Sequence, residues 1–461
     1  MRLQNLLLSN IKGYNGVIHN VSKLFQPLNI TPNEATVKNN DMTSKSQRLM
    51  IDNGVIQPIN NGLYHLLPLG MRAFDKLINL VDLHMHNVGA QKISLSSLTS
   101  AHLWETTGRY ITAGAELFNL TDRHQKKYVL SPTHEESITH LIASFQPFSH
   151  KRFPLLLYQI STKFRDEMKP RFGLIRAKEF IMKDLYSFDV NIESAQLTYK
   201  TLVDAYHHIF SAIGVKYIDV LGDTGLMGGT LSHEFHYPAD IGDDILLICA
   251  KCGSGKNKEV KMDDLVCQQC KSSDFHEHKG IEVGHTFMLG TRYSEPLKAL
   301  YSGPEGKAPL VMGSYGLGLT RILAASLEIL SLEDQLRWPA LLAPYKCIII
   351  TPKEGSKESK LLGNLAVELY LSMQSLPTCQ DNVILDDRSS LTIGKRLLEA
   401  KRSGYPFVIV VGKDAAASPS LIEVHNTMSN DCLKFTKSEL LDYLGNNQKN
   451  YDILEKIHIN L

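Results

Sequence analysis

The chain has 461 residues, of which 43% are hydrophobic and 21% charged, values that are ordinary for globular proteins. This length suggests roughly two or three domains. Lysine and arginine number 49 against 48 aspartate and glutamate, so the net charge of +1 gives no global steering toward a nucleic acid. Any such partner must meet local basic patches. No apolar run is long enough to span a bilayer, so we expect no membrane segment.

The N-terminus is free of acidic residues up to Glu34. Residues 1–33 contain Arg2, Lys12 and Lys23 and an apolar cluster at residues 6–8. N-terminal segments that lack acidic residues, are weakly basic and are partly amphipathic are typical of organellar transit peptides. We therefore interpret residues 1–44 as a transit peptide, and a disordered tail is the alternative that the composition leaves open.

The next segments are predicted to mix helices and strands. Residues 45–86 read as helix, turn, short strand and helix, and residues 194–213 read as a helix. Between them, LYQISTKFRDEMKPRFGLIRAKEFIMKDLYSF (157–188) is a predicted antiparallel hairpin. The strand period of two puts on one face Gln159, Ser161, Lys163, Arg165 and Glu167, and the return strand adds Arg176, Phe180 and Asp184. Arginines, carboxylates and an aromatic ring on one face suit a nucleotide, whereas a solvated strand face is the plainer alternative.

Four of the seven cysteines form two CxxC pairs. CAKCGSGKNKEVKMDDLVCQQC places Cys249 and Cys252 ahead of Cys267 and Cys270, which is the spacing of a zinc ribbon. Its core is too polar to fold by burial alone, so we expect a structural Zn²⁺, with four free thiols on a surface excursion as the alternative. This cysteine usage fits a reducing compartment better than a disulfide framework.

GSYGLGLTRILAASLEIL, residues 313–330, reads as a strand end, a glycine turn and a helix. The helix is apolar on nearly every face, which predicts that it is buried. Arg321 stands in its first turn, and the next charge, Glu328, is two turns away. Because a buried guanidinium without a partner is very unfavourable, Arg321 is predicted to meet an anion.

The pattern changes after WPALLAP (338–344), which reads as a linker. Strands over 346–352, 382–387 and 406–412 alternate with helices over 357–374 and 391–403, and this alternation predicts a small α/β domain. A basic stretch in this domain could contact a nucleic acid or could simply be solvated. Its members are Arg388, Lys395, Arg396, Lys401 and Arg402.

Several strings carry a family resemblance. FRDE, a loop, and then Arg176, Phe180 and Asp184 resemble the second signature motif of class II aminoacyl-tRNA synthetases, and GSYGLGLTR resembles the third. SPTHEE, KFRDEMKPRFGLIR, GGTLSHEF and GIEVGHTFMLGTRYSEPL together resemble prolyl-tRNA synthetases of the bacterial and mitochondrial type. The resemblance extends over roughly residues 45–445, and strings of this length in the family's order make chance implausible.

The resemblance implies the architecture and the partners. It implies an α+β catalytic domain over 45–335, an antiparallel sheet flanked by helices, with the cysteine element at 249–270. A linker over 336–345 and an α/β anticodon-binding domain over 346–461 would follow. It also implies a homodimer that binds L-proline and tRNA(Pro). The family's first motif, which packs the dimer interface, normally has a proline where this chain has Ser96.

The resemblance also implies the reaction. Proline would react with ATP to give prolyl-adenylate, and the prolyl group would then pass to the tRNA, with Mg²⁺ neutralising the pyrophosphate. Arg165 would bridge the α-phosphate and the proline carboxylate, Glu167 would contact adenine or hold its loop, and Arg321 would clamp the γ-phosphate. The implied ATP site is Arg165, Glu167, Arg176, Phe180, Gly316, Gly318 and Arg321. The implied proline site is Thr133, Glu135, Arg165, His233 and His285.

Three alternatives stay open. Thr133 and Glu135 of SPTHEE also fit a plain helix start. The chain could be a non-catalytic paralogue acting as an accessory or regulatory subunit, although such proteins usually lose the phosphate-binding arginines. It could also serve another amino acid, such as threonine or glycine.

The N-terminus and the mitochondrial-type resemblance predict that the protein is located in the mitochondrial matrix, or in the cytoplasm if no transit peptide is present.

Bacterial relatives often carry a large editing domain between the second and third motifs. Here residues 185–281 separate Asp184 from Glu282, and the predicted helix and the cysteine element occupy much of them. We therefore expect no editing domain of that kind.

Overall fold

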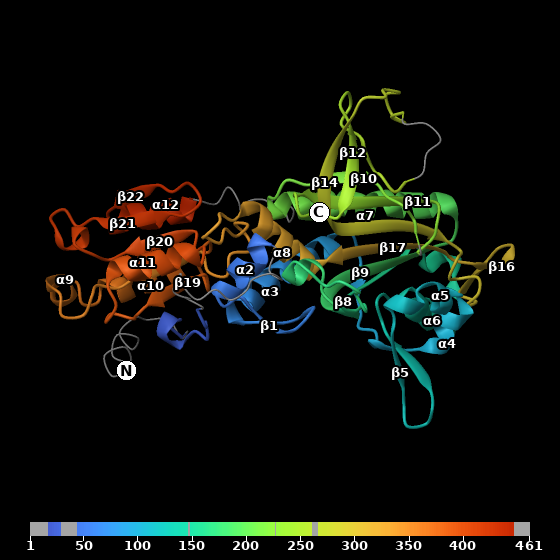
Figure 1. Cartoon of the computed structure of the whole chain (residues 1–461), viewed down its shortest axis with the longest axis horizontal. Coiled ribbons are helices and arrows are strands. Elements are labelled where there is room, and N and C mark those ends of the chain that lie inside the picture. The colour runs from blue at the N-terminus through green and yellow to red at the C-terminus, as the bar shows by residue number, and fades with distance from the viewer. Residues whose placement is uncertain (1–16, 29–43, 146–147, 226, 261–265, 447–461) are drawn as a thin grey trace.

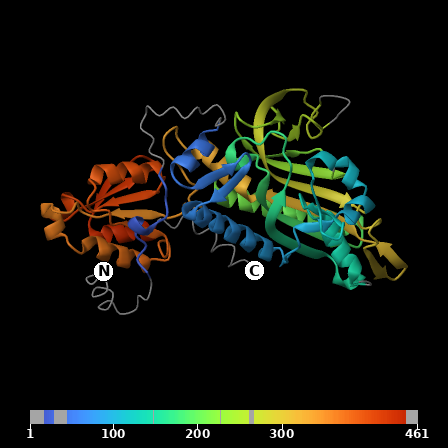
Figure 2. The same cartoon turned by 60° about the horizontal axis from the view of Figure 1, so that its bottom comes forward.

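The computed structural model describes residues 17–28, 44–145, 148–225, 227–260 and 266–446. Within these ranges the chain forms two bodies that lie side by side along the long axis, each with its own main sheet (Figures 1 and 2). Much of the predicted transit peptide, residues 1–16 and 29–43, lies outside the described residues. None of the described helices is both long enough and apolar enough to cross a lipid bilayer.

The larger body is built on a nine-stranded, largely antiparallel sheet. Its strand order is β11-β10-β13-β12-β14-β17-β9-β8-β3, and β14 also pairs with β11. The pairs β3–β8 and β10–β13 are parallel. The strands are β3 (Gln91–Lys92), β8 (Leu155–Phe164), β9 (Glu179–Asp189), β10 (Ile218–Leu221), β11 (Leu231–Pro238), β12 (Asp244–Cys249), β13 (Gly255–Asn257), β14 (Phe275–Gly290) and β17 (Val311–Gly318).

Helices α7 (Ile192–Ile213) and α8 (Leu319–Leu330) pack on one face of this sheet, and α3 (Pro68–Asn87) packs against both. Helix α7 begins where the Asn191 side chain accepts a hydrogen bond from the Ser194 amide, and it ends at Gly214, whose φ is 78°. The side chains that it turns to the core are Tyr199, Leu202, Tyr206 and Phe210, all buried. The helix predicted over 194–213 is therefore confirmed.

Smaller elements complete the larger body. Helix α2 (Lys45–Asp52) is followed by two strands, β1 (Ile56–Asn60) and β2 (Leu63–Leu66), where the sequence predicted one. The second strand arises because Gly62, with φ at 77°, lets the chain reverse. The remaining elements are β4 (Leu98–Ser100), β5 (Phe118–Thr121), β6 (Lys127–Leu130), β7 (Phe148–Ser149), β15 (Leu300–Gly303), β16 (Gly306–Pro309), α4 (Ala101–Thr106), α5 (Arg109–Thr112), α6 (Glu135–Ser144), η2 (Gly114–Glu116), η3 (His150–Arg152) and η4 (Gly173–Ile175).

The smaller body has a five-stranded sheet of order β19-β18-β20-β21-β22. One expected helix, over 357–374, is two helices, because Gly363 and Asn364 form a turn and both residue types are poor in helix interiors. The elements are β18 (Cys347–Ile350), α9 (Lys357–Leu361), α10 (Leu365–Gln374), β19 (Val383–Asp386), α11 (Ile393–Arg402), β20 (Phe407–Val410), η5 (Asp414–Ala416), β21 (Ile422–Asn426), β22 (Cys432–Phe435) and α12 (Lys437–Asn446).

The basic stretch of this body is partly used internally. Arg388 lies 2.7 Å from the Asp386 carboxylate and 2.8 Å from that of Glu399. Arg396 is buried and donates a 2.7 Å hydrogen bond to the Thr351 carbonyl. The surface that the sequence suggested for a nucleic acid is therefore reduced to Lys395, Lys401 and Arg402.

The two bodies are joined by packed chain rather than by a loose linker. Trp338 and Leu342 are buried, and the Trp338 indole donates a 3.0 Å hydrogen bond to the Ser403 carbonyl. Residues 17–28, part of the predicted transit peptide or disordered tail, pack on the smaller body and contain η1 (Val21–Lys23) (Figure 2). There the Leu385 amide donates to the His19 carbonyl at 2.8 Å. Residues 17–28 thus cover a sheet edge at β19, where Asn20 bridges to Leu385.

Candidate active site

A cavity of about 650 Å³ opens on the sheet face opposite α7. Alternate residues of β9 and β17 form its floor, namely Phe180, Met182, Asp184, Ser314, Gly316 and Gly318. The intervening residues face the helices, so that Lys183 donates to the Tyr206 hydroxyl at 2.7 Å. The polar face that the sequence predicted on the hairpin is thus the floor of a cavity rather than a solvated surface.

The predicted hairpin is formed by β8 and β9. In its register Gln159 lies opposite Asp184 and Lys163 opposite Phe180. The Lys163 ammonium lies 2.8 Å from the Asp184 carboxylate, and both side chains are buried. This pairing neutralises Asp184 at the inner end of the cavity.

Charged residues at the outer end of the hairpin form ion pairs with their neighbours. Arg176 donates from Nε to Glu167 at 2.9 Å and from Nη1 to Asp243 at 3.0 Å. The Arg165 guanidinium lies over the Phe180 ring, 5.2 Å from its centroid. The structure therefore brings Arg165, Glu167, Arg176 and Phe180 together in one cavity.

Two guanidinium groups share this cavity. Burial and the positive charge of Arg321 lower the pKa of Arg165, and its guanidinium nevertheless stays protonated at neutral pH. Nearby carboxylates, Glu282 among them, offset part of this repulsion, and an anion bound between the two guanidiniums would offset it further. A planar guanidinium binds two oxygens of a phosphate or carboxylate at once, so the pair suits a ligand with several anionic oxygens.

Arg321 is not the buried, unpartnered group that the sequence suggested. Its Nε donates to the Ile175 carbonyl and its Nη1 to the Glu282 carbonyl, both at 2.8 Å, and its side chain is 28% exposed to the cavity. The Glu282 carboxylate lies 3.7 Å from Nη1. The prediction failed because the partners come from segments distant in sequence. The two carbonyls orient the guanidinium, and the charge faces the cavity.

The glycines before Arg321 do not form the expected turn. Strand β17 runs through Gly313, Gly316 and Gly318, and α8 starts at the next residue, Leu319. Gly316 lies opposite Asp184 on one side and His285 on the other. Because Gly316 and Gly318 have no side chain, the strand backbone itself forms part of the cavity floor, and a ligand can approach it closely.

The start of α6 supplies the deepest polar groups of the cavity. Glu135 is fully buried, and its carboxylate accepts hydrogen bonds from Thr133 Oγ1 at 2.7 Å and from Ser314 Oγ at 2.9 Å. Arg109 Nη1 lies 3.3 Å from the same carboxylate. The plain helix-start reading of SPTHEE is compatible with this arrangement, since α6 begins at Glu135 and presents its side chain to the cavity.

The two expected histidines lie on opposite faces of the sheet. His285 lines the cavity, stacks on Phe287 at 3.9 Å and lies 2.6 Å from Ser232 Oγ. His233 instead lies 2.8 Å from the Tyr199 hydroxyl, in the layer of α7. The structure therefore does not bring His233 to the cavity, because on β11 Ser232 and Glu234 take the cavity face and His233 the other.

Two carboxylates stand beside Arg321. Glu282 lies 2.8 Å from His285 Nδ1. Burial alone would raise the pKa of Glu282, but His285 and Arg321 outweigh burial and hold it below its ordinary value. Burial and the negative charge of Glu282 raise the pKa of Asp244 to about 6. Neighbouring carboxylates that line a cavity are the donors that Mg²⁺ prefers.

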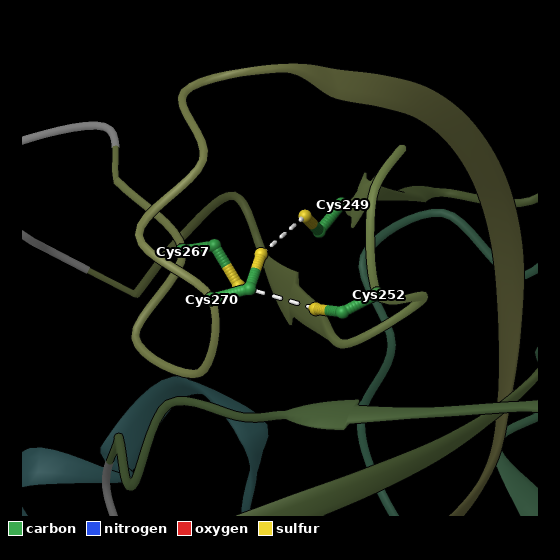
Figure 3. Close-up of side chains that lie close together, drawn as sticks. All are labelled: Cys249, Cys252, Cys267 and Cys270. Carbon is green, nitrogen blue, oxygen red and sulfur yellow. Dashed lines mark hydrogen bonds between the residues drawn. The ribbon is translucent and has the colours of Figure 1, made fainter.

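The four paired cysteines converge beside the ends of β12 and β14 (Figure 3), and none of them lines the cavity. Their sulfur atoms all lie within 4.8 Å of one another, and the pairs Cys249–Cys270 and Cys252–Cys267 are 3.5 Å apart. Sulfurs bound to one zinc ion at about 2.3 Å lie about 3.8 Å apart. The donor set and its spacing therefore fit a tetrahedral metal ion.

Both cysteine pairs are held by the same kind of turn. The amide of Gly253 donates to the Cys249 carbonyl, and the amide of Lys271 to the Cys267 carbonyl, each at 2.9 Å. Both residues have positive φ, 78° and 60°. For lysine this conformation is strained, and an ion that fixes the turn would account for it.

Several residues of this site were not predicted from the sequence, Asp243 and Asp244 among them. Ser314 was quoted within the glycine-rich string and Glu282 within GIEVGHTF, but neither received a role. Arg109 stands in ETTGRY, where nothing local indicates a buried ion pair. Only the fold brings Arg109 to Glu135.

The two bodies match two family models. Residues 118–330 match the tRNA synthetase class II core domain (G, H, P, S and T), and residues 346–447 match an anticodon binding domain. A core of this class with the cavity described above, joined to an anticodon-binding body, defines a class II aminoacyl-tRNA synthetase.

Curated relatives narrow the class. The chain is 47% identical to the human protein named "Probable proline--tRNA ligase, mitochondrial" over 432 residues, which are 92% of this chain and 90% of that protein. The rat protein of the same name is 46% identical, with the same shares. Proline--tRNA ligase of Ehrlichia chaffeensis is 34% identical over 88% of this chain and 96% of its own length. The chain belongs to the proline–tRNA ligase family.

Solved structures confirm the fold. The Cryptosporidium parvum prolyl-tRNA synthetase complexed with L-proline and AMP superposes with a TM-score of 0.70 at 16% identity, covering 91% of this chain and 79% of that one. The Giardia lamblia enzyme in complex with prolyl-adenylate gives 0.72 at 18% identity, covering 88% and 79%. The family and fold expected from the motifs are thus confirmed. Nothing in these comparisons supports a non-catalytic paralogue.

Proposed function

We propose that this chain attaches L-proline to tRNA(Pro) with ATP, through a prolyl-adenylate. The observation that carries the proposal is the pair of guanidiniums, Arg165 and Arg321, facing one cavity whose inner end holds the buried carboxylate Glu135. Such a cavity can hold a triphosphate and an ammonium group at the same time. Membership of the proline–tRNA ligase family supports the choice of proline.

The first step is an in-line displacement. A carboxylate oxygen of proline attacks the α-phosphorus of ATP, the bond to the bridging oxygen breaks, and pyrophosphate leaves. Arg165 lies over the Phe180 ring and shares the cavity with Arg321, and there it would contact both the carboxylate and the α-phosphate. Phe180 stacks on adenine, and Arg176, Glu167 and the glycine floor shape the nucleotide site. Catalysis then consists of positioning and charge stabilisation.

Proline is bound at the inner end. Thr133 and Glu135 take its ammonium, and His285 lines the ring subsite. In the second step a hydroxyl of the terminal tRNA ribose attacks the prolyl carbonyl, and AMP leaves. Mg²⁺ enters with ATP, and Glu282 and Asp244 would hold it beside Arg321, where it would neutralise pyrophosphate oxygens.

The cysteine cluster is proposed to bind one structural Zn²⁺. The convergence of four sulfurs and the two matching turns support it. The cluster lies apart from the cavity, and none of its cysteines lines that cavity. The ion therefore stabilises the tip of the sheet and takes no part in the reaction.

The proposed setting is the mitochondrial matrix, and the proposed assembly is a homodimer. Relatives at 46–47% identity are named as mitochondrial proteins, which supports the location. At the place of the missing motif proline, the Ser96 hydroxyl donates to the Leu98 carbonyl at 3.0 Å, just before β4. Next to it, Leu98 is 45% exposed, which suits an interface.

ATP–pyrophosphate exchange over all amino acids tests the function. We expect exchange with proline far above that with every other amino acid, threonine and glycine included. Exchange with none of the amino acids would favour the alternative that the chain is a non-catalytic paralogue. A maximal exchange rate with another amino acid would overturn proline as the proposed substrate.

A further inference from the structure

Arg109 is buried beneath the amino-acid end of the cavity. It is the first residue of the short helix α5, and its side chain is 5% exposed. Its guanidinium lies over the Trp104 ring at 4.7 Å and near the Tyr293 ring at 5.6 Å. This aromatic packing fixes the guanidinium plane and keeps water away from it.

One guanidinium serves two buried carboxylates here. Arg109 Nη1 lies 3.1 Å and 3.2 Å from the two oxygens of Glu136 and 3.3 Å from Glu135. Both glutamates are 0% exposed. Glu135 lines the cavity, whereas Glu136 lies behind it and also accepts from Thr107 at 3.0 Å. Burial raises the pKa of Glu136, and the positive charge of Arg109 opposes this shift. With both carboxylates ionised, the three groups carry a net charge of −1.

Neighbouring groups do not supply the missing positive charge. Lys163 lies 2.8 Å from Asp184, with which it forms a buried pair. Burial and the charge of Lys163 lower the pKa of His134 to about 4, so this imidazole is neutral at pH 7. Thr133, Ser314 and Tyr186 face the pair as neutral hydroxyl groups. An uncompensated buried charge is unfavourable, so the pair favours a cation that enters through the cavity.

We propose that Arg109 is a positioning residue for amino-acid selection. It neutralises Glu136 and, with Thr133 and Ser314, fixes the carboxylate of Glu135, which leaves a single uncompensated negative charge facing the cavity. The ammonium of the substrate supplies the missing cation. Proline therefore completes a three-charge cluster to neutrality, and a ring of the same shape without the ammonium does not. This inference rests on the proposed role of Glu135.

The test compares proline with tetrahydrofuran-2-carboxylate, which has a similar ring and carboxylate but no ammonium. The full-length Glu136→Gln variant removes the uncompensated charge while keeping the side-chain size. We expect its proline KM in pyrophosphate exchange to rise about tenfold or more, with the KM for ATP and inhibition by the ring analogue little changed. A purely structural Glu136 would instead change all three together.

Charge rescue provides the second arm. Arg109→Met leaves two buried carboxylates without a cation, so the pair takes up a proton, and this proton competes with the substrate ammonium for Glu135. We therefore expect weak proline binding that improves as the pH rises and the proton is released. Arg109→Met combined with Glu136→Gln restores the net charge of −1, and we expect it to recover most of the proline affinity. Arg123→Met, at an exposed loop position, is the matched control.

Each outcome has one meaning. If Glu136→Gln leaves the proline KM unchanged, or if the double variant is no better than Arg109→Met, the charge-completion proposal is overturned. If the Arg109→Met variant does not fold, the proline KM of the Glu136→Gln variant alone still tests the charge-completion proposal. Glu135→Gln distinguishes failure of the charge-completion proposal from failure of the proposed function. Normal proline exchange by that variant would refute the proposed role of Glu135 in binding the ammonium.

Discussion

Arg321 has its guanidinium oriented by two backbone carbonyls, from Ile175 and Glu282. Carbonyls accept hydrogen bonds but do not neutralise a full charge, and the Glu282 carboxylate stays 3.7 Å away. The positive charge therefore remains available to a phosphate. At the scale of single residues, Arg321 is thus positioned by two neutral acceptors, and its charge faces the ligand site.

This reading predicts the behaviour of Arg321 variants. Arg321→Leu should abolish pyrophosphate exchange while the protein stays folded, a loss on the order of 2–4 kcal/mol of transition-state stabilisation. Arg321→Lys should also be poor, because an ammonium lacks the planar fork. The Arg165→Leu variant should lose more, since charge develops at the α-phosphate. Exchange rates and thermal melting give the measurement, and near-normal exchange by folded Arg321→Leu would contradict the assignment.

Gly316 and Gly284 offer a matched pair of substitutions. A Cβ at Gly316 would meet its nearest atom, Met182 sulfur, at 3.5 Å, an ordinary contact, whereas one at Gly284 would meet Leu317 at 2.8 Å. We expect Gly316→Ala to keep its melting temperature but raise the KM for ATP about 10- to 100-fold, because the methyl group enters the cavity floor. Gly284→Ala should mainly lose stability. An unchanged KM for ATP in Gly316→Ala would mean that no ligand approaches this strand.

At the scale of elements, residues 17–28 act as a covering segment for the smaller body. Ile18 joins its core, His19 pairs with Leu385 and Tyr370, and the Gln26 amide reaches the Asn53 carbonyl of the larger body at 3.0 Å. We predict that deleting residues 1–28 lowers the melting temperature more than deleting residues 1–16 does, because the contacts described above belong to residues 17–28. Equal melting of both truncations would show that the segment does not stabilise the fold. Fusing residues 1–45 to a reporter tests import separately.

The cysteine cluster is the second such element. We expect about one zinc ion per chain in protein that has never been exposed to a chelator, because the two turns that carry the cysteine pairs are already formed. Cys252→Ser should lose the metal and lower the melting temperature. Exchange at low temperature should persist, because the cluster lies outside the cavity. Cys432→Ser, an exposed cysteine of the smaller body, serves as the control that keeps its zinc. Elemental analysis that finds no zinc would refute the site.

At the scale of the whole molecule, local signals predict most of the element types, whereas long-range partners are not predicted. The local exceptions are the division of 357–374 into α9 and α10, the strand in place of a glycine turn before α8, and the second strand β2. The β8–β9 hairpin, helix α7 and the cysteine pairs follow from period, caps and spacing, which are properties of short segments. The acceptors of Arg321, the pairing of Arg109 with Glu135 and the orientation of His233 depend on strand order. These contacts join residues between 26 and 146 positions apart along the chain, and no local pattern records them.

The order of elements across the whole chain also bears on proofreading. Between Asp184 and Glu282 every described element belongs to the larger body. These elements are the rest of β9, helix α7, strands β10–β13, the cysteine turns and the first part of β14. A small apolar subsite discriminates by only about 1–3 kcal/mol per missing methylene, so alanine should be activated at a low but measurable rate. With no separate hydrolytic body in that stretch of described chain, we predict that Ala-tRNA(Pro) added to the enzyme decays no faster than in buffer. The measurement is the deacylation rate of Ala-tRNA(Pro) with and without the protein, with Pro-tRNA(Pro) as the control. Rapid and selective loss of alanine by this chain alone would mean that the synthetic cavity, or residues outside the described ranges, can hydrolyse the ester.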